Sequence, residues 1–151
     1  METLDIRKAT LHDIDNLYFG AWCFHKEKLS QKTLHFDRKS VYQYFKWLIE
    51  NPLALVLVAN NGSFCGSIGG IITPWVLDFN IKIMTEMFWY VLPKQRGSAG
   101  LRLIKEFETM SHDMGANRIL MVGLEELNKP ISKYYTKHGY KHLEHHFIKE
   151  I

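Results

Sequence analysis

The chain has 151 residues, of which 46% are hydrophobic and 23% charged, a balance that is ordinary for one globular domain. Its formal net charge of +3 is too small to indicate nucleic-acid binding, which usually shows as a clustered basic face. The two cysteines, Cys23 and Cys65, lack the spacing of a metal site, and we expect them to be reduced. The sequence shows no secretory signal and no apolar stretch that approaches a membrane span. We therefore expect a single domain over residues 1–151, located in the cytoplasm, with no membrane partner.

The pattern of apolar residues predicts a mixture of strands and helices. Helices are indicated by apolar side chains spaced three or four residues apart, and strands by short apolar runs between turn residues. In chain order the predicted elements are a strand at 4–9, helices at 11–24 and 37–50, strands at 53–59, 63–73 and 81–92, a helix at 98–114, a strand at 118–124, a helix at 129–138 and a strand at 140–149. Residues 25–36 and 74–80 are predicted to be connecting loops. This order, β-α-α-β-β-β-α-β-α-β, predicts one mixed α/β sheet flanked by helices.

Capping and turn residues mark the ends of several elements. Thr10, followed by Asp13, is suited to cap the helix at 11–24. The Asn60-Asn61-Gly62 stretch is a strong hairpin signal, because Asn and Gly tolerate positive φ angles. Gly115 and Gly139 stand where two predicted helices end, a position in which glycine is preferred.

The most informative stretch joins the strand at 81–92 to the helix at 98–114. A proline and then Arg96-Gly-Ser-Ala-Gly100 lead directly into the helix, so its first backbone N–H groups have no bulky side chains in front of them. These unpaired donors and the positive end of the helix dipole both favour an anion, and glycine lets a pyrophosphate approach the backbone closely. The Gly-x-x-x-x-Gly-Lys-Ser/Thr motif of nucleoside-triphosphate sites is absent from the sequence. We therefore expect a phosphate-bearing cofactor at this turn.

The order of elements and this turn resemble the GCN5-related N-acetyltransferase (GNAT) superfamily over residues 4–149, and the 85–115 stretch looks most like small phage and prophage GNAT proteins. The resemblance implies a GNAT-like fold with a mostly antiparallel sheet and an enzyme that uses acetyl-CoA. Gln95 and Gly100 match the first and last positions of the family's pyrophosphate signature, whereas Ser98 replaces its middle glycine; a register that begins at Arg96 fits less well. The implied cofactor-binding residues are Tyr90, Val91, Leu92, Gln95, Arg96, Gly97, Ser98, Ala99, Gly100, Asn128 and Tyr135.

Acetyl transfer to an amine needs a base for the amine, a donor for the oxyanion and an acid for the departing thiolate. Glu86 is the candidate base, directly or through water, because it is a carboxylate in an otherwise apolar strand. In this interpretation the N–H of Val91 is the oxyanion donor. The stretch from Asn128 to Tyr140 resembles a family segment whose tyrosine protonates the thiolate, which implies Tyr135 as the acid, with Tyr134 as the other possible donor. We expect direct transfer, with no metal and no covalent enzyme intermediate.

The expected acceptor is a primary amine, either on a small molecule or on a protein lysine. His25, Glu27 and Trp75 are candidate substrate contacts, although surface positions explain these side chains as well. Trp75 either lines an acceptor pocket or packs against a second subunit, so a homodimer is possible. The weak charge neither supports nor excludes a nucleic-acid amine. The competing interpretation is a non-catalytic GNAT-fold module that binds or inhibits a host macromolecule.

Overall fold

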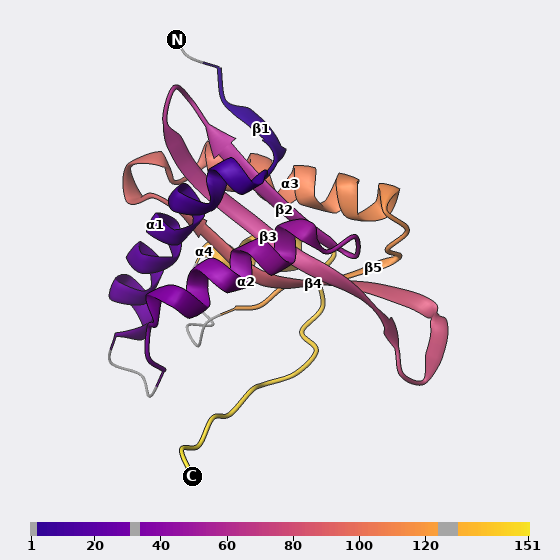
Figure 1. The fold of residues 1–151 in the computed structure, drawn as a ribbon. Coiled ribbons are helices and arrows are strands. Elements are labelled where there is room, and N and C mark those ends of the chain that lie inside the picture. The colour runs from indigo at the N-terminus through magenta and orange to yellow at the C-terminus, as the bar shows by residue number, and fades with distance from the viewer. Residues whose placement is uncertain (1–2, 31–33, 124–129) are drawn as a thin grey trace. The chain divides into compact units, whose positions relative to one another are not determined.

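A computed structural model describes residues 3–30, 34–123 and 130–151 (Figure 1). The chain divides into two compact units, Met1–Leu120 and Met121–Ile151. The strands of the first unit are β1 (Asp5–Lys8), β2 (Ala54–Asn60), β3 (Phe64–Trp75), β4 (Asp78–Val91) and β5 (Arg118–Leu120). Its helices are α1 (Ile14–Phe24), α2 (Arg38–Glu50) and α3 (Ser98–Asp113), with short helical turns η1 (Leu11–Asp13), η2 (His25–Leu29) and η3 (Pro93–Gln95). Among the described residues, no helix is long and apolar enough to cross a membrane.

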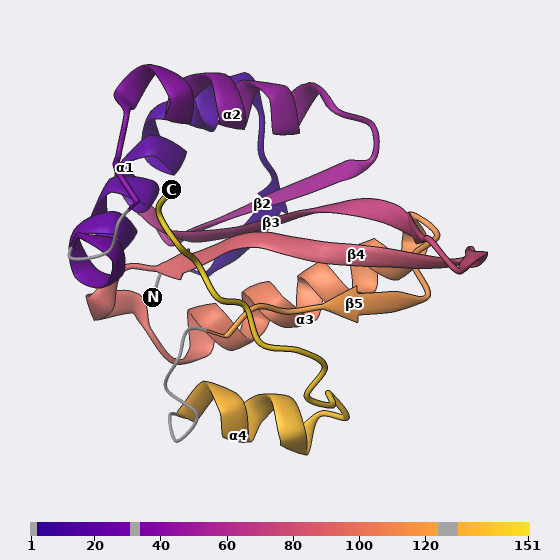
Figure 2. The ribbon, with the colours of Figure 1, turned by 90° about the horizontal axis from the view of Figure 1, so that it is seen from below.

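The five strands form one mixed sheet in the order β1-β2-β3-β4-β5. The first four strands pair antiparallel, and β5 runs parallel to β4 along Ile83 to Thr85 only. Helices α1 and α2 cover one face of this sheet, and α3 covers the other (Figure 2). The predicted mixed α/β sheet with flanking helices is therefore confirmed.

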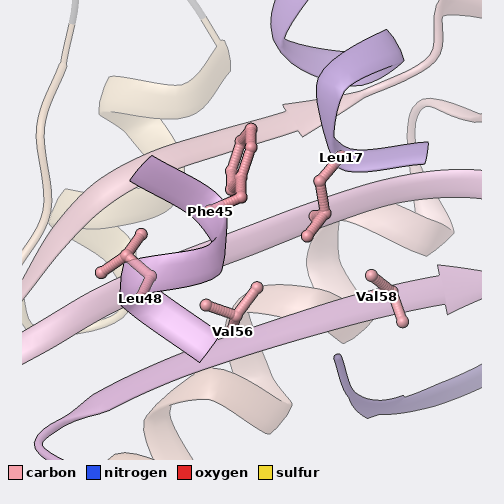
Figure 3. Close-up of a cluster of buried hydrophobic side chains, with 5 residues drawn as sticks. All are labelled: Leu17, Phe45, Leu48, Val56 and Val58. Carbon is pink, nitrogen blue, oxygen red and sulfur yellow. The ribbon is translucent and has the colours of Figure 1, made fainter. Parts of the chain in front are cut away.

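A cluster of apolar side chains joins α1 and α2 to the sheet. Its buried members are Leu17 from α1, Phe45 and Leu48 from α2, and Val56 and Val58 from β2 (Figure 3). Phe45 and Leu48 stand three residues apart and so share one face of α2, whereas Val56 and Val58 alternate on one face of β2. Each such side chain contributes roughly 1.5–3 kcal/mol when it is fully buried. This cluster holds the two helices against the sheet.

An ion pair between the exposed Arg7 and the buried Asp13 fastens β1 to the start of the first helix. The two terminal guanidinium nitrogens of Arg7 donate to the Asp13 carboxylate, at 2.8 and 2.9 Å, and the N–H of Thr10 donates to the same group at 2.7 Å. Asp13 is only 5% exposed. The capping interaction between Thr10 and Asp13 was predictable from their spacing, but the contribution of Arg7 was not.

Strand β4 has an irregularity next to Glu86, the candidate base. Gly69 pairs with Phe88 and Gly70 with Glu86, so the register between β3 and β4 skips Met87 and forms a bulge. A Cβ atom at Gly70 would overlap the carbonyl oxygen of Thr85, which explains the glycine at this crossing. Because a bulge bends its strand and increases the local twist, it accounts for the end of the pairing between β4 and β5 at Thr85.

The predicted loop at 74–80 is wrong. The structure continues β3 to Trp75 and starts β4 at Asp78, so the connection is a tight hairpin. Pro74 pairs with Lys82 at a point that β2 no longer reaches, since β2 begins opposite Ile71. An edge position tolerates proline, because the missing N–H would face solvent. Proline therefore did not end this strand.

Three other expectations also differ from the structure. Residues 25–29, predicted to be loop, extend α1 as a π-helical turn. The strand predicted at 118–124 ends at Leu120, where its pairing with β4 stops; residue 124 lies outside the described residues. The strand predicted at 140–149 is irregular, and its apolar side chains Leu143 and Phe147 are exposed. An apolar pattern alone does not form a strand without a neighbouring strand to accept its backbone hydrogen bonds.

The second unit contains one described helix, α4 (Pro130–Lys137). Gly139 follows the end of the helix, and its φ of 85° is the left-handed conformation expected of a glycine there. The N–H of Tyr140 donates to the carbonyl of Tyr135 at 3.0 Å across this end. The helix predicted at 129–138 is thus confirmed over 130–137.

Candidate active site

The turn after β4 presents the backbone donors that the sequence predicts. Gly97 has a φ of 103° and a ψ of −110°, which glycine adopts readily and other residues do not, and it precedes the first residue of α3. Leu101 makes the first bond of the helix, from its N–H to the Gly97 carbonyl at 3.2 Å. The N–H groups of Ser98, Ala99 and Gly100 come before it and have no acceptor within the helix. The turn can therefore donate to an anion.

There is room in front of this turn. A Cβ atom placed on Gly97 would meet no heavy atom within 4 Å, and the side chain of Ser98 is exposed. Gly100 is buried, and a Cβ placed on it would face the sheet, at the ordinary contact distance of 3.6 Å from Trp89 Cζ2 and from Val91 Cγ2. The residues present thus fit a pyrophosphate: free donors, a positive helix end and an open approach.

Beside the turn, the end of β4 has an open edge. The N–H of Leu92 donates to the Cys65 carbonyl at 2.8 Å and so points toward β3. Backbone groups alternate between the two edges of a strand, so the N–H of Val91 points away from β3. Within residues 3–30 and 34–120, the structure pairs no strand with this edge of β4 beyond Thr85. The open edge can bind an extended ligand through main-chain hydrogen bonds.

Arg96 and Glu27 connect this turn to the end of α1. The Arg96 guanidinium donates to the Val91 carbonyl at 3.1 Å and to the Glu27 carboxylate at 2.6 Å. The Tyr90 hydroxyl donates to the same carboxylate at 3.0 Å, and the guanidinium lies 5.5 Å from the centre of the Tyr90 ring. The predicted residues Glu27, Tyr90, Val91 and Arg96 are therefore neighbours in the structure.

These contacts set the protonation states of the cluster. The hydrogen bonds from Arg96 and, more weakly, from Tyr90 hold the pKa of Glu27 below its ordinary value. Burial, followed by the hydrogen bond to Glu27, raises the pKa of Tyr90 to about 12. At neutral pH the cluster thus contains a carboxylate, a guanidinium and a neutral phenol.

Gln95, the residue that best matches the first position of the expected signature, is also fixed in place. Its side-chain oxygen accepts a hydrogen bond from the Asn61 amide at 3.1 Å, which ties the turn to the β2–β3 hairpin. The contribution of Asn61 was missed, because nothing in its sequence context relates it to a residue 34 positions later. The hairpin signal at Asn60-Asn61-Gly62 predicts the turn but not this bond.

Glu86 is a buried carboxylate in β4. It is 7% exposed and stands opposite Gly70, next to the bulge. Burial, with a further contribution from the charge of Glu86, raises the pKa of Tyr44 in α2 to about 12. Val91 is five residues farther along the strand, about 16 Å away at the rise of an extended chain. The two residues are therefore too far apart along β4 to contact the same atom.

The remaining predicted residues lie elsewhere or outside this unit. His25 packs against Phe36, with ring centres 5.3 Å apart. Trp75 stands at the tip of the β3–β4 hairpin, at the opposite end of β4 from Val91, and Figure 2 shows this hairpin on the side away from α1. Tyr135 belongs to α4 in the second unit, and Asn128 lies outside the described residues. The structure thus groups the turn residues with Glu27 and does not bring Trp75 to them.

A small apolar cavity of about 60 Å³ lies next to Tyr90. Its walls include the side chains of Phe24, Phe45 and Phe88 from the α1–α2 face of the sheet. At about 30 Å³ for a water molecule in the liquid, this volume equals about two waters. The cavity is large enough for a methyl-sized group and too small for a whole acceptor molecule.

Comparison with known proteins points to one family. The sequence pattern of the acetyltransferase (GNAT) family matches residues 12–140, which is most of the chain. No curated protein is similar enough in sequence to count as a relative.

Solved structures share the fold at low sequence identity. A transcriptional regulator from Bacillus halodurans C-125 has a TM-score of 0.79 and 17% identity, and the match covers 99% of this chain and 100% of that one. An aminoglycoside acetyltransferase from an uncultured soil metagenomic sample has a TM-score of 0.76 and 13% identity, over 98% and 96% of the two chains. A predicted acetyltransferase with acetyl-CoA from Clostridium acetobutylicum has a TM-score of 0.72 and 17% identity, again over 98% and 96%. At these identities the likeness concerns the fold alone.

Proposed function

Because the chain belongs to the acetyltransferase (GNAT) family, we propose that it is an N-acetyltransferase that moves an acetyl group from acetyl-CoA directly to a primary amine. The observation that carries this proposal is the unpaired N-terminus of α3 next to the open edge of β4. The N-terminus of α3 suits a pyrophosphate, and the open edge of β4 suits an extended chain that is bound through its amide groups. Their adjacency suits a ligand that contains both, as acetyl-CoA does.

The phosphate contacts come from the turn itself. The N–H groups of Ser98, Ala99 and Gly100 point to the place where the pyrophosphate would bind. Arg96, which is half exposed, lies beside them as a cation. The fold neighbour from Clostridium acetobutylicum with acetyl-CoA supports the same choice of ligand. The cofactor supplies an activated thioester; the chain supplies binding and positioning.

At the reacting end, Val91 and Glu86 have separate roles. The N–H of Val91 on the open edge is the donor for the oxygen of the thioester carbonyl, where negative charge develops. A lysine-like amine with a pKa of about 10.4 costs roughly 4–5 kcal/mol to deprotonate at pH 7. Glu86 removes this proton, directly or through water.

Tyr135 is the proposed acid for the departing thiolate. A thiol with a free pKa near 8.5 leaves more easily when a donor is close, and a tyrosine hydroxyl is suited to this role. Tyr134 is its neighbour on α4, with the two ring centres 6.2 Å apart, and is the alternative donor. The acceptor is an amine on a small molecule or a protein lysine. The aminoglycoside acetyltransferase with the same fold favours testing amino sugars first.

The first test measures the melting temperature with and without saturating acetyl-CoA. Ligand at about 100 times its Kd should stabilise the fold by about 2.7 kcal/mol, or roughly 5–10 °C for a chain of this size. Gly100→Glu should abolish this shift, because it brings a negative charge to the pyrophosphate. Gly100 is buried beside Trp89 and Val91, so the melting temperature of the variant without ligand is compared with that of the wild type to check that the fold is kept. Gly100→Ala is the matched control and should keep the shift, since its Cβ makes only ordinary contacts.

A second assay then follows free thiol with a panel of primary amines. Amine-dependent thiol release by the wild type, lost in Gly100→Glu and kept in Gly100→Ala, is the expected result. A well-folded wild type that shows no shift with acetyl-CoA would contradict the proposal and favour the non-catalytic interpretation of the fold.

A further inference from the structure

A π-helical turn carries Glu27 to the cofactor turn. Helix α1 ends at Phe24, and residues His25–Leu29 continue it as a π-helix, a form that is rare and often marks functional sites. No residue of this turn is fully buried, and only His25 and Leu29 are partly buried. Its principal tie to the sheet is the Glu27 carboxylate, which contacts Arg96, 69 positions later, and Tyr90.

The Arg96 guanidinium is held in place by contacts with Val91, Glu27 and Tyr90. Arg96 bonds the Val91 carbonyl through Nε and Glu27 through Nη2, and its planar group lies over the Tyr90 ring. A free arginine side chain loses much rotamer freedom when it binds a phosphate. In this structure that freedom is restricted before any ligand arrives. Such preorganisation lowers the cost of binding.

We propose that Glu27 is a positioning residue for acetyl-CoA binding, which acts by holding Arg96 beside the N-terminus of α3. The inference rests on the proposed function, since it takes the ligand of this turn to be acetyl-CoA. Glu27 itself contacts neither the cofactor nor the acceptor. The sequence-based hypothesis made Glu27 a direct substrate contact. In the present proposal Glu27 acts through Arg96 and Tyr90 instead.

The negative charge of Glu27 lowers the affinity for acetyl-CoA, because a carboxylate competes with phosphate for the guanidinium. The pair is partly exposed, with 46% of the Arg96 side chain and 28% of the Glu27 side chain accessible, so solvent and salt screen much of this attraction. Solvent and salt do not screen the other effect of Glu27, which is the restricted rotation of the Arg96 side chain. We therefore expect the loss of Glu27 to weaken the binding of acetyl-CoA.

The test is a double-mutant cycle on the full chain, read by calorimetric titration with acetyl-CoA. Glu27→Gln should weaken binding about 3–10-fold, and Arg96→Gln at least as much. Because Glu27 acts through Arg96, the double variant should bind no more weakly than Arg96→Gln alone. Glu50→Gln is the control, since it makes the same change at an exposed glutamate of α2, and it should bind acetyl-CoA as the wild type does.

Steady-state kinetics separate positioning from a general structural effect. Glu27→Gln should raise the KM for acetyl-CoA and leave kcat unchanged, with the melting temperature of the free protein within a few degrees of wild type. Three results would overturn the inference: unchanged affinity in Glu27→Gln, tighter binding, or a full further loss when Glu27→Gln is added to Arg96→Gln. Absence of acetyl-CoA binding by the wild type would instead overturn the proposed function and this inference together.

Discussion

Replacing Gly97 with alanine separates the backbone geometry of the turn from the stability of the fold. The φ of 103° and ψ of −110° at Gly97 are strongly unfavourable for alanine. The new Cβ would meet no heavy atom within 4 Å, so the cost comes from the backbone and not from a clash. Such strain costs about 2 kcal/mol, within the usual range of 1–3 kcal/mol. For a chain of this size, that lowers Tm by roughly 4–8 °C.

Gly115, at the other end of α3, provides a matched control. Its φ is 99°, and a Cβ there would also meet nothing within 4 Å. Gly115→Ala should therefore lose a similar free energy of unfolding and leave acetyl-CoA binding intact. Gly97→Ala should lose the same stability and also weaken acetyl-CoA at least about tenfold, because the turn must change shape to relieve the strain and its N–H groups then move.

Urea unfolding followed by tryptophan fluorescence gives the two stabilities, and calorimetric titration gives the two affinities. Equal affinity for acetyl-CoA in the Gly97→Ala and Gly115→Ala variants, together with the expected loss of stability in both, would refute the reasoning. In that case the backbone of this turn would not be the phosphate site.

Three further predictions concern other parts of the chain. Ser111→Ala should raise the unfolding free energy by about 1 kcal/mol in urea titrations, because the fully buried hydroxyl of Ser111 has no hydrogen-bond partner among the described residues. A destabilised variant would mean that the hydroxyl has a partner. The hydrogen bonds from Arg7 hold the pKa of Asp13 below its ordinary value, so this pair contributes stability at neutral pH that is lost as pH falls through the depressed value. Asp13→Asn should therefore cost about 2 kcal/mol at pH 7 and much less near pH 2, and an equal loss at both would contradict the linkage. Tyr135→Phe should lower turnover about 100-fold with acetyl-CoA affinity within twofold of wild type; unchanged turnover would move the acid to another group, with Tyr134 tested next.

The geometry of the turn before α3 could be predicted from sequence because its determinants are local. A proline, small residues and an apolar stripe fix the start of α3, and Gly97 and Gly115 occupy its two ends with the positive φ angles that only glycine adopts readily. The same holds for α2, which begins where the Asp37 side chain accepts the N–H of Ser40 at 2.8 Å. Short-range patterns of this kind need no knowledge of the rest of the fold.

The errors arose where distant partners decide the structure. Pro74 stayed in a strand because it lies at an edge, and the segment at 140–149 stayed irregular despite its apolar residues. Neither edge nor pairing can be read from a local window. The link between Glu27 and Arg96 also depends on the folded sheet and on a π-helical turn for which the sequence gives no signal. The candidate site was therefore predicted for its backbone and only in part for its side chains.

The central claim is that the N-terminus of α3 holds the phosphates of acetyl-CoA. The most direct measurement follows the backbone amide signals of a ¹⁵N-labelled sample by NMR during titration with acetyl-CoA. The account predicts the largest shifts at Gly97, Ser98, Ala99 and Gly100, with Val91 also affected and Gly115 unchanged. Shifts concentrated elsewhere, or none at saturating acetyl-CoA, would contradict it.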